Sequence, residues 1–132
     1  MWEYRAALAG TIAESVHDGD TVRLLIDLGF DARVVKWIRL SDVHAPELSQ
    51  PGGQQTRAYV ADWASRTVRS GGPWPIRVMT DLNTKANQIT SFDRYVGRVW
   101  AMADLASLNE YVQAYLAEHP DWPGGKALAR DA

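Results

Sequence analysis

The chain has 132 residues, a formal net charge of −2 and no cysteine. This length is enough for one compact domain with one core, and the lack of cysteine excludes disulfides and thiolate metal sites. Because 14 basic residues face 16 acidic ones, a broad basic surface for nucleic acid is also excluded, and any phosphate site must be local.

The hydrophobic pattern indicates a protein outside the membrane. No apolar run approaches the roughly 20 residues that a membrane span needs. The first ten residues, MWEYRAALAG, lack the basic start, apolar stretch and cleavage site of a secretory signal. We therefore expect a cytoplasmic, monomeric protein of one domain over residues 1–132, with a core from about 4 to 118 and a loose tail over 119–132.

The first part of the chain predicts three strands. Residues 4–16 are expected to form one strand with Leu8, Ile12 and Val16 inward, although their spacing of four also suits a helix. Residues 21–27 alternate apolar and polar side chains, the pattern of a half-buried strand. It follows directly on two aspartates and a glycine, so these aspartates are expected at the mouth of that strand.

The third strand is expected over residues 33–40, after the turn LGFDA. Val34, Trp37 and Leu40 do not alternate cleanly, which predicts a bend or a β-bulge. Residues 41–53 contain two prolines and two glycines and predict a long irregular connection. Connections of this kind often carry functional residues.

The second part of the chain predicts two helices and two strands. Residues 54–69 contain neither glycine nor proline and place apolar side chains on one helical face. Strands are expected over 74–80 and 95–103, separated by a polar loop over 81–94. The final helix is expected over 107–118, because Ser107 and Glu110 have the spacing of a capping box.

This order of elements predicts the fold class. Five strands are too many for a helical bundle, and they do not alternate with helices as in a parallel sheet. We expect a mainly β, α+β fold: a five-stranded OB-fold Greek-key barrel with one helix after strand 3 and a second after strand 5.

Several short motifs, taken in chain order, resemble those of the staphylococcal nuclease family, the thermonuclease-like OB-fold nucleases. The turn DLGF resembles that of phage-borne members, so a bacterial host or a phage is the expected source. The resemblance covers roughly residues 10–118. Its motifs are DGDTV at 18–22, RL at 39–40, APE at 45–47, GQQTRAYV at 53–60 and DRYVGR at 93–98.

The resemblance implies a calcium-dependent phosphodiesterase that acts on DNA and RNA. Its metal ligands would include the carboxylate of Asp20 and the backbone carbonyl of Ala45, with Asp18 supporting the water around the metal. No membrane and no disulfide is expected to take part, and a DNA or RNA substrate is the implied partner.

The resemblance also gives roles to residues that act on the substrate. Glu47 would orient or deprotonate the attacking water, while Arg39 and Arg98 would hold the phosphate. Tyr95, with Arg94 beside it, resembles a family tyrosine that contacts the nucleotide. Hydrolysis of a phosphodiester needs an aligned water, a proton acceptor and positive charge over the phosphate oxygens, and these residue types supply such groups.

One position departs from the family pattern, because His44 stands where the family has a second carboxylate ligand. An imidazole suits transition metals better than calcium, so His44 makes a transition metal possible at this site. Asp42, two residues earlier, is a candidate for the missing carboxylate or for a partner of the imidazole. Arg39 and His44 reach one site only if the chain turns over residues 41–43.

The same departure supports a second hypothesis. An OB-fold with a degenerate metal site would bind nucleic acid, or another protein, without hydrolysing it. Three tryptophans, Trp37, Trp63 and Trp100, are expected in the core rather than as surfaces for base stacking.

Overall fold

The computed structural model describes residues 3–80 and 94–124. Its elements follow one another as three short segments, a long hairpin, a long helix, two strands and a final helix. In order they are β1 (Glu3–Leu8), α1 (Ile12–Ser15), β2 (Val16–Asp18), β3 (Thr21–Gly29), β4 (Ala32–Leu40), α2 (Gly53–Ser70), β5 (Ile76–Thr80), β6 (Arg94–Ala101) and α4 (Leu108–Ala117).

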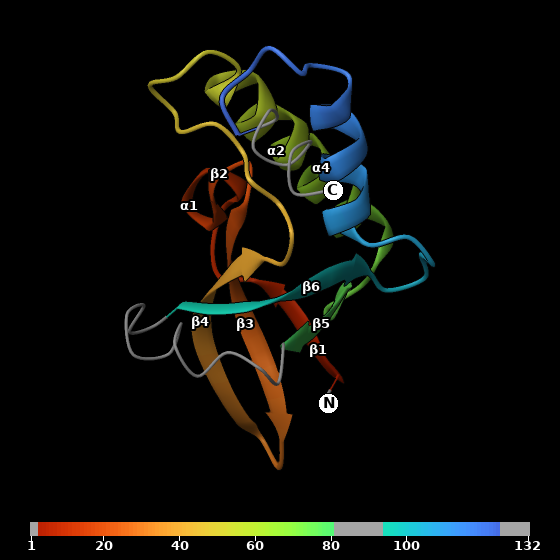
Figure 1. Cartoon of the computed structure of the whole chain (residues 1–132). Helices are drawn as coiled ribbons and strands as arrows, with labels where there is room; N and C mark the ends of the chain where they lie inside the picture. The colour runs from red at the N-terminus through yellow and green to blue at the C-terminus, as the bar shows by residue number, and fades with distance from the viewer. Residues whose placement is uncertain (1–2, 81–93, 125–132) are drawn as a thin grey trace.

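Five of the strands close into a barrel. The strands lie in the order β1-β5-β6-β4-β3-β2, and β1 also pairs with β3. The β4–β6 pair is parallel, whereas the other pairs are antiparallel. Helices α2 and α4 lie over one end of the barrel, and the β3–β4 hairpin projects away from them (Figure 1). The predicted mainly β, OB-fold-like class is therefore confirmed.

The alternation predicted for residues 21–27 is also confirmed. Val22, Leu24 and Ile26 are buried in the core, so the odd-numbered side chains of β3 face outward. In β4, Ile38 and Leu40 are buried, and here too the odd-numbered side chains face outward. This parity decides which residues of the hairpin reach the surface.

Two local predictions are wrong. Residues 4–16 do not form one strand, because Thr11 and Glu14 make a capping box that starts the short helix α1. The Thr11 hydroxyl accepts a hydrogen bond from the Glu14 amide at 3.2 Å. Of the bend or bulge predicted for residues 33–40, the bulge is absent, because β4 pairs regularly with β3 over residues 33–39; the register shifts instead between Asp27 and Gly29 of β3.

The helix predictions agree closely with the structure. Helix α2 spans residues 53–70, against the expected 54–69. Helix α4 has the predicted capping box of Ser107 and Glu110. No helix among the described residues is long and apolar enough to cross a membrane. Residues 81–93 of the expected loop lie outside the described residues, and so does the tail from residue 125. Residue 94, the last of the expected loop, belongs to β6.

The tryptophans divide into two groups. Trp63 of α2 is 4% exposed and belongs to the core, as predicted. Trp37 and Trp100 are half-buried and lie outside the buried core, so the prediction for them is wrong. Both occupy outward-facing positions of their strands, where the guanidinium groups of Arg23 and Arg77 lie over their rings.

One buried side chain joins the final helix to the barrel. Asn109 of α4 is fully buried. Its amide nitrogen donates to the carbonyls of Ser41 and Gly97, each at 3.0 Å, and its oxygen accepts from the Val99 amide at 3.1 Å. These bonds connect α4 to β6 and to the turn after β4.

We predict that Asn109→Ala lowers the free energy of unfolding by about 3 kcal/mol, because it removes three buried hydrogen bonds between α4 and the barrel. Urea denaturation measures this change. Gln113→Ala is the matched control: its amide, on the same helix, donates one exposed hydrogen bond to the Asp42 carbonyl, and we expect a loss below about 1 kcal/mol. Equal losses in the two variants would contradict this role of Asn109.

Candidate active site

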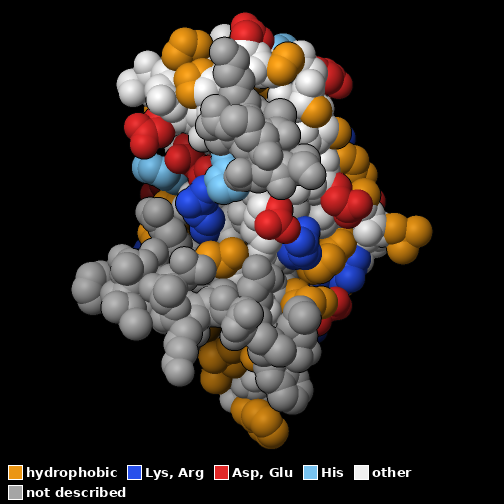
Figure 2. Space-filling model, viewed as in Figure 1, with side chains coloured by type: hydrophobic (Ala, Val, Ile, Leu, Met, Phe, Trp, Pro, Cys, Tyr) orange, Lys and Arg blue, Asp and Glu red, His pale blue; other side chains and the backbone are white. Residues whose placement is uncertain are grey.

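A polar pocket of about 510 Å³ lies beside the turn between β2 and β3. Figure 2 shows acidic, basic and histidine side chains gathered on the surface between the barrel and the helices. The pocket draws on β2, β3, β4 and the connection between β4 and α2. Its lining residues are His17, Asp18, Asp20, Thr21, Arg39, Ala45, Glu47, Leu48 and Ser49.

The turn between Asp18 and Asp20 packs closely against two other segments. A Cβ atom on Gly19 would clash with the Thr56 side chain of α2 and would lie 2.8 Å from the Cβ of Ala45. Real Cβ atoms are essentially never found this close to another heavy atom. Glycine at position 19 therefore permits the approach that brings both aspartates to the β4–α2 connection.

Asp20 is the most buried carboxylate of the pocket, with 8% of the residue exposed. Its Oδ2 accepts a hydrogen bond from the Ala45 amide at 3.2 Å and lies 3.5 Å from Nη2 of Arg39. Its Oδ1 accepts from the Thr21 hydroxyl at 3.0 Å. One carboxylate thus joins the start of β3, the end of β4 and the connection that follows.

Arg39 is held from two sides and retains an unused donor. Its Nη2 donates to the Val43 carbonyl at 3.2 Å, in addition to its ion pair with Asp20. Among the described residues, its buried Nε has no hydrogen-bond partner. The guanidinium is therefore fixed in the pocket, while 35% of the Arg39 side chain is exposed and can be reached by an anion.

The carboxyl of Asp18 is harder to ionise than that of an exposed aspartate. Burial, together with the neighbouring Asp20 carboxylate, raises the pKa of Asp18 to about 6, although the hydrogen bond that Asp18 accepts from the Asp20 amide acts in the opposite direction. Two carboxylates with this interaction form a pair that a cation would stabilise.

Glu47 lies on the side of the pocket formed by the β4–α2 connection. Its side chain is exposed, while its backbone is fixed by Gln50: the Glu47 amide donates to Oε1 of Gln50 at 2.8 Å, and the Gln50 amide donates to the Glu47 carbonyl at 2.9 Å. The carboxylate therefore extends from an ordered backbone into water, where it can accept a proton.

The predicted turn between Arg39 and His44 is present. The Val43 amide donates to the Leu40 carbonyl at 3.4 Å, and Asp42 has a left-handed backbone with φ of 60°. The turn brings Ala45 into the pocket but leaves the side chain of His44 outside its lining. Of the metal ligands that the resemblance implies, Asp18, Asp20 and Ala45 therefore line the pocket, and His44, the residue that departs from the family pattern, does not.

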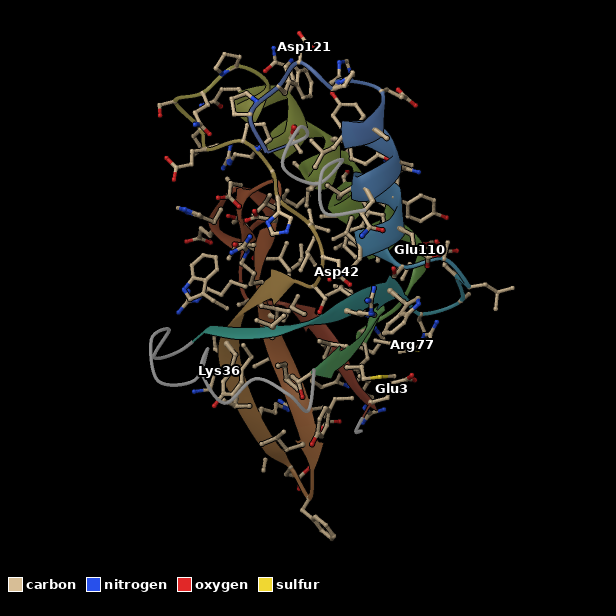
Figure 3. The ribbon with its side chains drawn as sticks, viewed as in Figure 1. Glu3, Lys36, Asp42, Arg77, Glu110 and Asp121 are labelled. Atoms are coloured by element: carbon tan, nitrogen blue, oxygen red, sulfur yellow. The ribbon has the colours of Figure 1, made fainter. Side chains whose placement is uncertain are left out.

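Arg98 does not line the pocket with Arg39. Its Nη2 donates to Oδ2 of Asp42 at 2.8 Å, and Asp42 does not line the pocket either. Figure 3 shows Asp42 where the connection after β4 passes β6. Arg98 nevertheless faces outward on the strand next to Arg39, because Arg39 pairs with Val96, two residues before Arg98.

The residues expected to contact the nucleotide lie elsewhere or are not described. Tyr95 lines a separate, mostly apolar groove with Ile38 and Lys36, and the ammonium of Lys36 lies 5.6 Å from its ring centre. The structure does not describe the side chain of Arg94.

Sequence reasoning gave no role to His17. The structure places His17 in the pocket lining, with Nε2 3.9 Å from Oδ2 of Asp18. The position of His17 directly before the Asp-Gly-Asp turn could have indicated this place, because β2 carries His17 and Asp18 to the same end of β3.

Four side chains of the pocket could serve as metal donors: the carboxylates of Asp18, Asp20 and Glu47 and the imidazole of His17. Among the described residues no group of three or more His, Cys, Asp or Glu side chains is arranged to hold a metal. Carboxylate oxygens suit calcium or magnesium, which retain water ligands, whereas an imidazole suits transition metals.

The segment after α4 packs behind the β4–α2 connection. A Cβ atom on Gly124 would clash with the carbonyl of His44, and one on Gly52 would clash with the indole of Trp122. Trp122 stacks on His119 with ring centres 3.8 Å apart. The connection that carries Ala45 and Glu47 is therefore also packed against the segment after α4.

Comparison with models of known protein families gives no match, and comparison with curated proteins also gives no match.

We predict that Gly124→Ala moves the backbone of His44 and Ala45 and weakens the hydrogen bond from the Ala45 amide to Asp20. Hydrogen exchange measured by NMR should show at least about tenfold faster exchange of that amide. The rigid neighbour is backbone, so it cannot yield by rotating a side chain.

Gly72→Ala is the matched control for this prediction. Gly72 has φ of 67°, close to the 73° of Gly124, and a Cβ there would meet no atom within 4 Å. Both variants introduce the same left-handed strain of about 1–2 kcal/mol. Equally fast exchange of the Ala45 amide in Gly124→Ala and Gly72→Ala would contradict the claim that Gly124 specifically supports this hydrogen bond.

Proposed function

We propose that the chain is a metal-dependent phosphodiesterase that hydrolyses DNA or RNA. The observation that supports this most strongly is the meeting of Asp20, Arg39 and Glu47 in one polar pocket. These residues come from the start of one strand, the end of another and an irregular connection. A carboxylate for a cation, a guanidinium for a phosphate and an exposed carboxylate for a proton are the groups that this hydrolysis needs.

Arg39 binds and orients the phosphate in this proposal. Its contacts with the Val43 carbonyl and with Asp20 fix the plane of the guanidinium. A fixed guanidinium donates to two phosphate oxygens in one geometry, and its charge stabilises the negative charge that develops in the transition state. Thr21 pairs with Arg39 across the hairpin and holds Asp20 through its hydroxyl.

Glu47 accepts the proton of the attacking water. The water oxygen forms a bond to phosphorus, the bond from phosphorus to the leaving oxygen breaks, and the proton of the water passes to the Glu47 carboxylate. Asp20 and Asp18 would hold a divalent cation, calcium or magnesium, which supplies positive charge to the phosphate oxygens when bound.

Arg98 is available to join the phosphate at small energetic cost. Its ion pair with Asp42 lies at the surface, with side-chain exposures of 36% and 69%. Exposed ion pairs of this kind stabilise a fold by only about 0–1 kcal/mol. A phosphate in the pocket therefore competes only with the weakly bound Asp42 for the guanidinium of Arg98.

We predict that Glu47→Gln and Arg39→Ala each reduce cleavage of labelled single-stranded DNA by at least about a hundredfold, since one removes the proton acceptor and the other the phosphate charge. The assay uses calcium, magnesium, manganese and zinc in turn, with a chelated sample beside them. Chelation should abolish cleavage, and added calcium or magnesium should restore it.

Glu3→Gln is the control for the charge change. Glu3 of β1 forms an ion pair with Arg77 of β5, and both residues are labelled in Figure 3. Glu3 does not line the pocket. Cleavage by this variant should equal that of the unmodified chain. Equal activity in Glu47→Gln, with a fold intact by circular dichroism, would reject the assigned role.

A second function is favoured by the pairing of Arg98 with Asp42 and by the position of His44 outside the pocket. With one guanidinium engaged and one carboxylate missing, the barrel would bind nucleic acid without hydrolysing it. The same assay separates the two functions: a binding module retains DNA with salt-dependent affinity and leaves it intact with every metal.

We predict that Asp42→Asn increases the rate of cleavage several-fold, because it releases Arg98 toward the pocket. The free energy of unfolding should change by less than about 1 kcal/mol, as expected for an exposed pair. Single-turnover cleavage and urea denaturation measure the two quantities. Asp62→Asn, which breaks an exposed pair with Arg66 on α2, should leave the rate unchanged, and an equal rise there would contradict a specific effect of Arg98.

A further inference from the structure

A row of side chains continues from the pocket along the outer face of the β3–β4 hairpin. Thr21 and Arg39, which line the pocket, form one cross-strand pair, and the next outward pair is Arg23 with Trp37. Successive outward residues of a strand lie about 7 Å apart. Trp37 is therefore the first aromatic side chain that a chain leaving the pocket along this hairpin would meet.

Trp37 is held in place by two neighbours. The guanidinium of Arg23 lies 5.7 Å from the centre of its ring. The imidazole of His17 meets the ring edge-on, with centres 6.0 Å apart and planes at 76°. Because His17 also lines the pocket, the pocket and the aromatic surface are continuous.

The energetics of folding do not account for this arrangement. Trp37 is half-buried and lies outside the core, and Arg23 and the His17 side chain are exposed. A surface cation–π contact contributes only about 0.5–1 kcal/mol. An aromatic ring beside a cation, next to the partly exposed guanidinium of Arg39, is instead the combination that binds bases and phosphates of single strands.

We propose that Trp37, with Arg23 and His17, binds the base of an unpaired nucleotide next to the phosphate held in the pocket. This inference rests on the proposed function, since it takes the pocket to bind a phosphodiester. In a duplex each base is stacked between its neighbours and its face is hidden. The surface therefore selects single-stranded nucleic acid, without preference among bases, since every base has an aromatic face.

The test measures binding in chelator, where no cleavage interferes. Fluorescence anisotropy gives the affinity for a labelled 12-nucleotide single strand and for a duplex of the same sequence. Trp37→Ala should weaken single-strand binding about tenfold or more and leave duplex binding unchanged. Trp37→Phe keeps an aromatic face and should stay within about threefold of the unmodified chain.

Trp100→Ala is the matched control. Trp100 is also half-buried, also has a guanidinium over its ring, at 4.9 Å from Arg77, and does not line the pocket. Its removal should leave single-strand binding unchanged. The thermal unfolding of Trp37→Ala and Trp100→Ala is measured to compare the stability of the two variants.

An abasic strand gives a second test, in which the ligand is changed as well as the protein. Removing the bases should weaken binding to the unmodified chain and to Trp100→Ala, but should have little further effect on Trp37→Ala. Such non-additivity is expected only if the ring and the base contact each other.

The outcomes separate this inference from the proposed function. Single-strand binding that depends on Trp37, without cleavage in any metal, would reject hydrolysis and keep the base-binding surface. Cleavage with equal binding by Trp37→Ala and the unmodified chain would keep hydrolysis and overturn the surface. Equal losses for Trp37→Ala and Trp100→Ala, or for single strand and duplex, would also overturn it.

Discussion

The candidate site depends on the close approach of three segments at Gly19. The Asp18–Asp20 turn, the Ala45 side chain and Thr56 of α2 meet there without space for a Cβ atom. A larger residue would separate the turn from the β4–α2 connection and break the hydrogen bond between the Ala45 amide and Asp20. The carboxylates, Arg39 and Glu47 share a pocket because this contact holds their backbones together.

The support of the pocket extends across the whole helical end of the barrel. Asn109 fixes α4 to β6 and to the turn at Ser41. From the end of α4 the chain returns to the His44 carbonyl, with Trp122 and Gly124 packed behind the connection. The order of the pocket therefore rests on contacts between segments that are distant in the sequence.

Local patterns in the sequence predicted most of the barrel and the helices. Alternation gave the inward face of β3, and the spacing of Ser107 and Glu110 gave the start of α4. The first segment was predicted wrongly because a spacing of four fits two structures, and the capping box at Thr11 decided for a helix. Trp37 was assigned to the core because the regular parity of β4 was not evident from its mixed composition.

The candidate site was predictable only as far as backbone motifs determine it. Asp20, Arg39 and Glu47, which the resemblance singled out, line one pocket in the structure. The positions of the Arg98 and His44 side chains depend on the conformation of the turn at Asp42. That turn has a left-handed residue, and no local pattern indicated that its carboxylate would capture Arg98.

The most direct measurement of the central claim is a crystal structure of the inactive Glu47→Gln variant with manganese and a single-stranded trinucleotide. Anomalous scattering locates the metal. The account predicts a metal ion in contact with the Asp20 carboxylate and a phosphate between that ion and the Arg39 guanidinium. A metal or a phosphate bound only at another surface, with Asp20 and Arg39 unchanged, would contradict it.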